Sequence, residues 1–562
     1  MYQKETLGMN RIFKYSTRLF VALGAGLLIG PAAFAQDSLK QATIELISTY
    51  QPKLRDAAKL NLTASLPAAD TSRARMTYDI PALNLNFMYQ PVPLRPLALG
   101  KDSVNALQNN FVKVGFGNLK TPLVQAGIGS GRNDQYNFGL FVNYIGSKGN
   151  IEYQDYNNVN VLASGTYYSP LFEIDGKVAY NRNQVHYYGY DHALYDYSKA
   201  DVKQTFNEFI GKIGLKNRPT NEWGFIFKPA AEFIYFNDAF DRNERTFTLK
   251  ALLRKQIFED IYLQAEGIAD LSTFKEKDLE SINNNVVSIH PALEIAKPGF
   301  FLHAGANPTW TNGYDNTGFV KSKFYLLPDI VNETHLVKKK LILSSGWISY
   351  FEKNNFRNLA QKNPFIDSYP GEPANTRIEE RYTGIKGTIG GHFNYNTKFS
   401  SIVYENMALF VNNDTDGKTF NVRNETEMKA FQVHAEVGYI EEEKFQVRVS
   451  GDWFNYRKQA TELKPWGLVP FMANLNAQVS VAKKLHLTGD LYGFSGSYYL
   501  VAPNDFAKTD GAFDLNLGAN YDIGKNVNLW INANNLFNSE YQRWNGYKSY
   551  GFNIVGGIML KF

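Results

Sequence analysis

The sequence contains no cysteine among its 562 residues, which excludes disulfides, thiolate metal sites and a lipid anchor on cysteine. Beyond residue 35 it has no apolar run approaching the roughly 20 residues of a membrane-spanning helix. The formal net charge is only +5, and part of that excess lies at the N-terminus in Lys4, Arg11, Lys14 and Arg18. So small an excess gives no reason to expect a nucleic-acid partner.

Aromatic residues and glycine are plentiful instead. The chain has 40 Phe, 35 Tyr and 44 Gly, and its mean hydropathy is −0.34. A helical membrane protein would be far more apolar, whereas a membrane β-barrel combines aromatic girdles with a polar interior. The composition therefore favours a β-rich chain.

Residues 1–35 have the pattern of a secretory signal. Basic residues precede the apolar run 19–29, and Ala33 and Ala35 frame a small-x-small cleavage site before Gln36. The run is too short for a membrane anchor. We expect cleavage after Ala35.

Residues 36–108 form a second region with a different composition. Pro91, Pro93 and Pro96 fix an extended backbone and disfavour helix in the residues before them. We expect a periplasmic N-terminal segment that is extended and too small to build a core of its own.

The region 109–562 shows the two-residue period of β-strands. In 513–523 every second residue is apolar and the residues between them are polar or small. The same alternation predicts about 22 strands, two of them near 381–397 and 400–411. Short connections alternate with long ones at 188–202, 352–380, 412–425 and 538–551. We therefore expect an all-β transmembrane barrel with short periplasmic turns and long extracellular loops.

The polar face of these strands identifies the lumen. A soluble half-buried sheet gives the same alternation in one hairpin, but a dry core cannot hold unpaired charges and amides. A water-filled lumen can. The expected lumen-lining residues are Gln432, His434, Glu436, Arg448, Asp452, Asp514, Asn516, Asn520 and Asn532.

The last strand ends on apolar residues of one face, Ile558, Leu560 and Phe562. Because barrels of the outer membrane close on such a strand, we expect these residues to face lipid. We also expect the barrel assembly machinery to read them as an insertion signal.

The C-terminal segment contains residues 534–538, Asn-Asn-Leu-Phe-Asn, followed by Tyr541, Gly546-Tyr547 and Gly556-Gly557. With these residues it resembles the C-terminal end of TonB-dependent receptors. The resemblance implies the outer membrane of a Gram-negative bacterium and a role in solute transport. The chain departs from that family because residues 36–108 are too few for the family's folded plug. Residues 42–47 resemble the family's TonB-contacting segment, but any short alternating stretch can match it, and the alternative is a strand or helix that docks on the periplasmic rim or on another protein.

No catalytic constellation stands out. None of the eight histidines has the spacing of a metal site on a helix, and residues 414–417 match only half of a calcium loop. We expect no enzyme activity, no metal and no cofactor.

Two functions follow from a wide barrel without a plug. An empty lumen would leak, so the loops, residues 36–108, or a separate surface or periplasmic protein must fill it. The first function is a transporter or channel for a solute. The second is a structural or assembly subunit whose partners fill or cap the barrel. The aromatic residues of the last loop, Tyr541, Trp544, Tyr547 and Tyr550, suit either sugar stacking or a membrane girdle.

Overall fold

The computed structural model describes residues 110–562, except 132, 219–223, 316–317, 368 and 442–443. The predicted signal sequence, the predicted periplasmic segment 36–108 and the TonB-like residues 42–47 lie outside the described residues.

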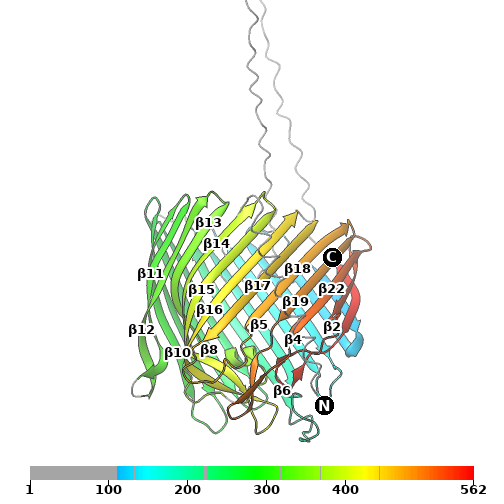
Figure 1. Cartoon of the computed structure of the whole chain (residues 1–562). Coiled ribbons are helices and arrows are strands. Elements are labelled where there is room, and N and C mark those ends of the chain that lie inside the picture. The colour runs from blue at the N-terminus through cyan, green and yellow to red at the C-terminus, as the bar shows by residue number, and fades with distance from the viewer. Residues whose placement is uncertain (1–109, 132, 219–223, 316–317, 368, 442–443) are drawn as a thin grey trace, which may run out of the picture. The chain divides into compact units, whose positions relative to one another are not determined.

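Twenty-two strands form one antiparallel sheet that closes on itself (Figure 1). The first strand, β1, pairs with β2 on one side and with the last strand, β26, on the other, so that Phe111 faces Lys561 and Gly117 faces Val555. This confirms the predicted all-β barrel. In chain order its strands are β1 (Phe111–Gly117), β2 (Thr121–Gly129), β3 (Tyr136–Ser147), β4 (Tyr156–Tyr168), β5 (Phe172–His186), β6 (Lys203–Asn217), β7 (Phe225–Asn237), β8 (Asn243–Phe258), β9 (Ile261–Lys275), β10 (Ile282–Lys297), β11 (Phe300–Asp315), β12 (Gly318–Val337), β13 (Leu341–Glu352), β14 (Thr376–Ile389), β15 (Phe393–Asn412), β16 (Phe420–Glu441), β17 (Phe445–Arg457), β18 (Phe471–Ala482), β19 (Leu485–Phe494), β22 (Ala512–Asp522), β23 (Val527–Asn534) and β26 (Asn553–Lys561).

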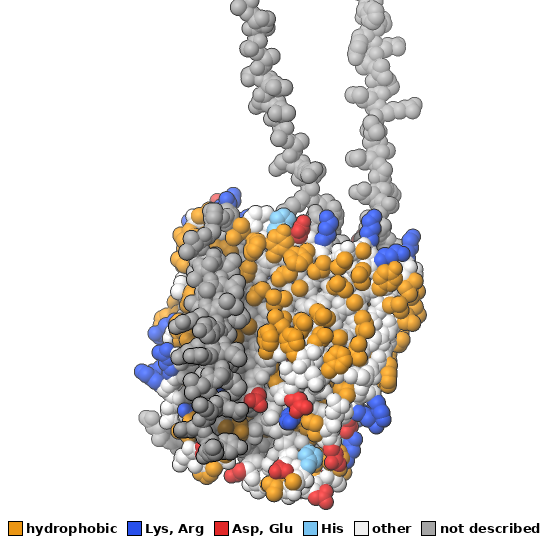
Figure 2. All heavy atoms as spheres, turned by 45° about the vertical axis from the view of Figure 1, so that its right-hand side comes forward, with side chains coloured by type: hydrophobic (Ala, Val, Ile, Leu, Met, Phe, Trp, Pro, Cys, Tyr) orange, Lys and Arg blue, Asp and Glu red, His pale blue; other side chains and the backbone are white. Residues whose placement is uncertain are grey.

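The outer face of the barrel is apolar. Large hydrophobic side chains stand exposed along the strands, among them Ile213, Val449 and Ile531, which are 58%, 45% and 45% exposed. Figure 2 shows them as a broad band, with charged side chains toward the two ends. So much exposed apolar surface is unfavourable in water and matches the hydrocarbon of a bilayer. In the part of the chain that the structure describes, no helix has the length and apolarity to cross a membrane.

One predicted turn was wrong. The predicted strands 381–397 and 400–411 place a turn near residue 398, but β14 ends at Ile389 and β15 begins at Phe393. The chain reverses at Gly390 and Gly391, whose φ angles are +60° and +81°. Glycine enters this region without a steric cost. The alternation of side chains continues on both sides of the turn, so periodicity alone misplaced it. The loop after β15 is also shorter than predicted, because β16 already begins at Phe420.

The connections at the loop end of the barrel contain small elements of their own. The 3₁₀ turn η1 (Asn118–Lys120) is the whole short connection between β1 and β2, and the helix α2 (Phe356–Lys362) lies in the long loop between β13 and β14. Two hairpins, β20 (Tyr498–Ala502) with β21 (Asp505–Lys508) and β24 (Gln542–Trp544) with β25 (Tyr547–Lys548), lie in the last two long connections. All of these elements lie at the end of the barrel opposite the short turns.

Candidate functional site

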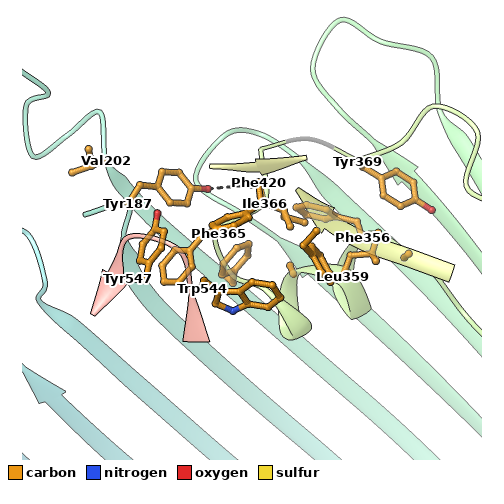
Figure 3. Packing of buried hydrophobic residues seen from close by; sticks show 14 of the residues in the cluster. Tyr187, Val202, Phe356, Leu359, Phe365, Ile366, Tyr369, Phe420, Trp544 and Tyr547 are labelled. Carbon is orange, nitrogen blue, oxygen red and sulfur yellow. Dashed lines mark hydrogen bonds between the residues drawn. The ribbon is translucent and has the colours of Figure 1, made fainter. Parts of the chain in front are cut away.

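The long loops fold together into a packed structure, which we call the loop cap. It comprises residues 187–202, 353–375 and 535–552 with the strand ends that they touch (Figure 3). Its core is apolar and closed to solvent: Phe356, Leu359 and Ile366 are 0% exposed. The buried residues of this core are Tyr187, Tyr188, Tyr190, Val202, Phe206, Phe236, Phe274, Phe356, Leu359, Ala360, Phe365, Ile366, Tyr369, Ala408, Phe410, Phe420, Trp544 and Tyr547. The loops therefore form a folded unit at the mouth of the barrel.

Aromatic rings join three of the loops at the centre of the loop cap. The ring of Phe365 stacks on that of Tyr547, with centroids 3.5 Å apart, and Tyr188 meets Tyr547 edge-on at 5.0 Å. Each ring comes from a different loop. Burial raises the pKa of Tyr547, so its phenol is neutral and donates to the backbone oxygen of Lys418. Such contacts add to the burial of apolar area, and they make the three loops a single packed body.

Helix α2 is fixed by a carboxylate from the barrel wall. Asn355 caps the helix, accepting a hydrogen bond from the backbone N–H of Asn358 at 3.1 Å. Glu244 of β8 then accepts bonds at 2.7 Å from the Asn355 amide and from the backbone N–H of Phe356. A negative charge is favourable at a helix N-terminus. The first turn of α2 is thus tied to the wall.

A second attachment of α2 runs along the wall as an amide ladder, made of Gln125, Asn143, Asn160, Asn181 and Glu208. The register of β2 to β6 places each residue directly opposite the next. Successive side-chain hydrogen bonds measure 2.9, 3.0, 3.1 and 2.6 Å. At the end of the ladder, the free oxygen of the carboxylate accepts from Arg357 of α2. Five strands therefore hold the helix through one chain of hydrogen bonds.

The ends of the α2 loop are attached by buried polar contacts. Lys353 forms an ion pair with Asp270 of β9 and donates to Ser272 at 2.7 Å. Burial lowers the pKa of Lys353, an effect that Asp270 opposes. At the other end, Asn375 exchanges two hydrogen bonds, at 2.7 and 3.0 Å, with Asn284 of β10. Buried polar groups without a hydrogen-bond partner are costly. Each pair therefore favours the loop position in which both of its members are hydrogen-bonded.

A further loop is held in the same way. Glu425 of β16 is 0% exposed, and its carboxylate accepts from the backbone N–H groups of Ala460, Thr461 and Glu462 at 2.8, 3.0 and 2.7 Å.

The calcium-like residues 414–417 form a turn in which Asp416 accepts from the backbone of Lys418 and Thr419. Among the described residues, no three His, Asp or Glu side chains are grouped to hold a metal ion.

A cavity of about 490 Å³ lies between the loop cap and the barrel wall, a volume typical of ligand pockets. It is lined by amides, most of them on the barrel wall, and by aromatic rings from both the loop cap and the wall. The amides are those of Asn516, Asn532, Asn534, Asn535 and Asn553, and the rings are those of Tyr188, Phe365, Tyr492, Tyr541, Trp544, Tyr547, Tyr550 and Tyr156. Ligand sites combine these two kinds of surface.

The charges around this cavity have one sign. Arg543 and Lys548 line it, and none of the described residues that line it carries a carboxylate. Lys548 pairs with Glu540 at 3.0 Å. Arg543 lies over the ring of Trp544, 4.1 Å from its centroid, and donates to the backbone oxygen of Gly467 at 2.9 Å. Within the described part of the chain it has no carboxylate partner. Burial lowers the pKa of Arg543, which means that its charge is poorly solvated.

The predicted lumen residues fall into separate groups. His434 and Gln432 of β16 both contact Asp452 of β17, at 3.0 and 2.9 Å. On the same two strands, Arg448 lies 3.5 Å from Glu436. Their apolar neighbours, such as Phe431 and Val449, are exposed on the opposite face of the sheet.

The remaining predicted residues belong to β22 and β23. Asn516 and Asn532 line the cavity beneath the loop cap. Asp514 is fully buried and accepts from the backbone N–H of Phe537 in the last loop at 3.2 Å. Asn520 stands farther along β22, away from the cavity lining. At the C-terminus Ile558, Leu560 and Phe562 are 45%, 48% and 60% exposed; their recognition by the assembly machinery stays a prediction.

Sequence reasoning missed the loop cap. It treated 352–380 as one long loop, although Asn355 followed by Phe356, Leu359 and Ala360 has the cap and spacing of a short amphipathic helix. The sequence analysis assigned Trp544 and Tyr547 either to sugar stacking or to a membrane girdle. Both are buried in the core of the loop cap, at 7% and 5% exposure. The amide ladder had no sequence signal, because it requires the register of five strands.

Comparison with solved structures identifies the fold. The FrpB iron transporter from Neisseria meningitidis superposes with a TM-score of 0.63 at 11% identity, covering 81% of this chain and 81% of that one. The siderophore receptor PirA from Acinetobacter baumannii gives 0.62 at 9%, covering 81% and 80%. The ferripyoverdine receptor of the outer membrane of Pseudomonas aeruginosa gives 0.59 at 12%, covering 81% and 71%. The barrel has the fold of siderophore receptors.

Sequence comparisons add no family to this fold. No family model matches the chain, and no curated protein matches it by sequence. The structural superpositions confirm the predicted likeness to TonB-dependent receptor barrels at the level of the fold. Sequence identities of 9–12% show a common fold and do not show that this chain binds the solute of any of these proteins.

Proposed function

We propose that the protein is a transporter of the receptor type in the outer membrane of a Gram-negative bacterium, and that the loop cap is its outer gate. The observation that carries this proposal is the closed loop cap over a cavity of about 490 Å³. A solute that occupies the cavity from outside must pass the loop cap. The receptor fold and the exposed apolar belt support the membrane location.

The attachments of α2 suit a gate that has two positions. Arg357, Lys353 and Asn375 hold it through discrete polar pairs. Phe356 also packs against Phe236 and Phe274 of the wall, with ring centroids 5.5 and 5.1 Å apart. A buried ion pair adds little net stability, because the attraction between the two charges is offset by the cost of removing both from water. Opening of the gate then separates these pairs and the rings of Phe356 and Tyr369 from the wall without unfolding strands, as in other order–disorder or hinge transitions.

We also propose a role for the residues outside the described part. Residues 36–108 are a periplasmic segment rather than a folded plug, as their prolines and their small number suggest. The predicted lumen residues Gln432, His434 and Asp452 then line the path below the loop cap. Whether the segment engages TonB or another periplasmic protein decides how opening is energised.

A reversible cross-link tests the gate. Tyr314 of β11 donates to Glu372 of the α2 loop at 3.2 Å, and both positions are accessible. Cysteines at these two positions are the only thiols in the chain, so a short cross-linker that forms a disulfide with each thiol joins them alone and is released by reduction. In planar bilayers containing the low-molecular-weight fraction of a culture, we expect brief openings that stop after cross-linking and return after reduction. Each single-cysteine variant is the control.

Two results would contradict the proposal. Openings that continue unchanged after complete cross-linking would show that the α2 loop does not gate the barrel. An absence of openings, together with polypeptides that co-purify in fixed ratio, would indicate the alternative function of a structural or assembly subunit.

A further inference from the structure

The cavity beneath the loop cap contains hydrogen-bonding groups that the protein itself leaves unused. Asn516 accepts from the backbone N–H of Asn535 at 3.0 Å, but its NH₂ group has no partner within the described residues. The side chain of Asn532, which lines the same wall, has none there either. Both side chains are half-buried. Amides held in place by rigid strands and turned to a cavity are ready to bind oxygen-rich groups.

The only unpaired charge at the cavity is that of Arg543, among the residues that the structure describes. Its guanidinium is half-buried, stacks on Trp544 and donates one hydrogen bond within the described residues, to a neutral backbone oxygen. A guanidinium has five N–H donors. A half-buried cation without a counter-ion is unfavourable, and a carboxylate on a ligand would supply both the charge and the acceptors, with two parallel hydrogen bonds.

Aromatic surface completes the cavity. The rings of Tyr156 and Tyr550 meet at 5.3 Å, and the phenol of Tyr550 is already engaged with the backbone oxygen of Gln154 at 2.6 Å. The hydroxyls of Tyr492 and Tyr541 lie 2.7 Å apart, and both residues line the cavity. This combination of ring faces, hydroxyls and amides fits a flat ring that carries several hydroxyl groups better than it fits an apolar ligand.

From these groups we infer that the cavity binds an acidic sugar unit, a hydroxyl-bearing ring with one carboxylate, which Arg543 recognises. This inference rests on the proposed transport function and names its solute class. Arg543 holds the carboxylate, and Asn516 and Asn532 bind ring hydroxyls on the opposite wall. The cavity favours an anionic solute over a cationic one, because both charged side chains that line it among the described residues are basic.

Binding of digalacturonate to the purified full-length protein tests the inference. Its dimethyl ester is a matched probe that keeps the rings and the hydroxyls but has no charge, because both carboxylates are esterified. We expect the acid to bind at least about tenfold more tightly than the ester, because a hydrogen-bonded ion pair in a half-buried site contributes about that factor. Calorimetry measures both affinities, and quenching of tryptophan fluorescence reports on Trp544.

Three variants assign the effect. Arg543→Gln should remove the preference for the acid and leave the affinity for the ester unchanged, and Arg543→Lys should restore part of the preference. Asn532→Leu should weaken both probes equally. Lys199→Gln removes a cation of the outer loop surface that pairs with Asp155 at 2.7 Å, and it should change neither affinity. Heat-modifiable migration shows that each variant is folded.

Several results would overturn the inference. Equal affinity for the two probes, or a preference that survives Arg543→Gln, would show that Arg543 does not recognise a carboxylate. Binding of neither probe would reject the acidic-sugar class. In each case the cross-linking experiment still decides separately whether the loop cap is a gate, so failure of the solute class is distinguishable from failure of the transport function.

Discussion

Arg357 of α2 donates to Glu208 of β6, a residue 149 positions earlier in the chain. The arginine side chain is 21% exposed and the glutamate side chain is 8% exposed. The same carboxylate ends the amide ladder along the wall, so the loop and five strands share one charged group. This contact joins the outer gate of the proposed transporter to the barrel.

Arg357→Gln is therefore expected to loosen the loop cap. It leaves the Glu208 carboxylate in place without its cation, at a cost of about 1–3 kcal/mol. Ala360, which is 3% exposed, reports on the change when it is replaced by cysteine. We expect the thiol at position 360 to react at least about tenfold faster with maleimide in the Arg357→Gln background.

Arg381→Gln is the control for this variant. Arg381 is 66% exposed and pairs with Glu379 at 2.7 Å, and such surface pairs contribute little. It should leave the labelling rate at position 360 unchanged. If the rate were also unchanged in Arg357→Gln, the contact would not hold the cap closed.

The two faces of the last strands should tolerate charge differently. Ile531 is 45% exposed on the apolar outer face, so Ile531→Arg should cost about 2–4 kcal/mol near the middle of the bilayer. Asn520 lies on the polar face, and Asn520→Arg should be tolerated. The amount of folded, heat-modifiable protein in membranes measures the difference. Equal losses in both variants would reject the assignment of inside and outside.

The orientation in the membrane follows from the position of the loop cap. Leu194, at 77% exposure, lies in the long connection between β5 and β6, whereas Lys483 lies in a short turn at the opposite end. With Leu194→Cys we expect labelling of intact cells by an impermeant reagent. With Lys483→Cys we expect labelling only after lysis. The reverse pattern would invert the topology.

Particular residues show which features of the fold and of the cavity could be predicted from the sequence. Alternation such as that of Phe513, Asp514 and Leu515 predicted the barrel correctly, because a two-residue period is a local property of strands. The turn at Gly390 was missed because the alternation passes through it. The loop cap was missed because its contacts, such as Arg357 with Glu208, connect residues that only the closed barrel brings together. Two cavity residues, Asn516 and Asn532, were predicted as lumen residues, but Arg543 was not.

The conductance of the barrel tests most directly whether the loop cap closes it. The measurement compares, in planar bilayers, the chain without residues 36–108 and the same chain with Arg357→Gln and Lys353→Gln. We predict no steady current for the first protein, since the packed core around Phe356 and Tyr547 seals the mouth by itself. We predict frequent openings for the second. A large steady current through the barrel with an intact loop cap would contradict the account, because it would show that the loops leave the lumen open.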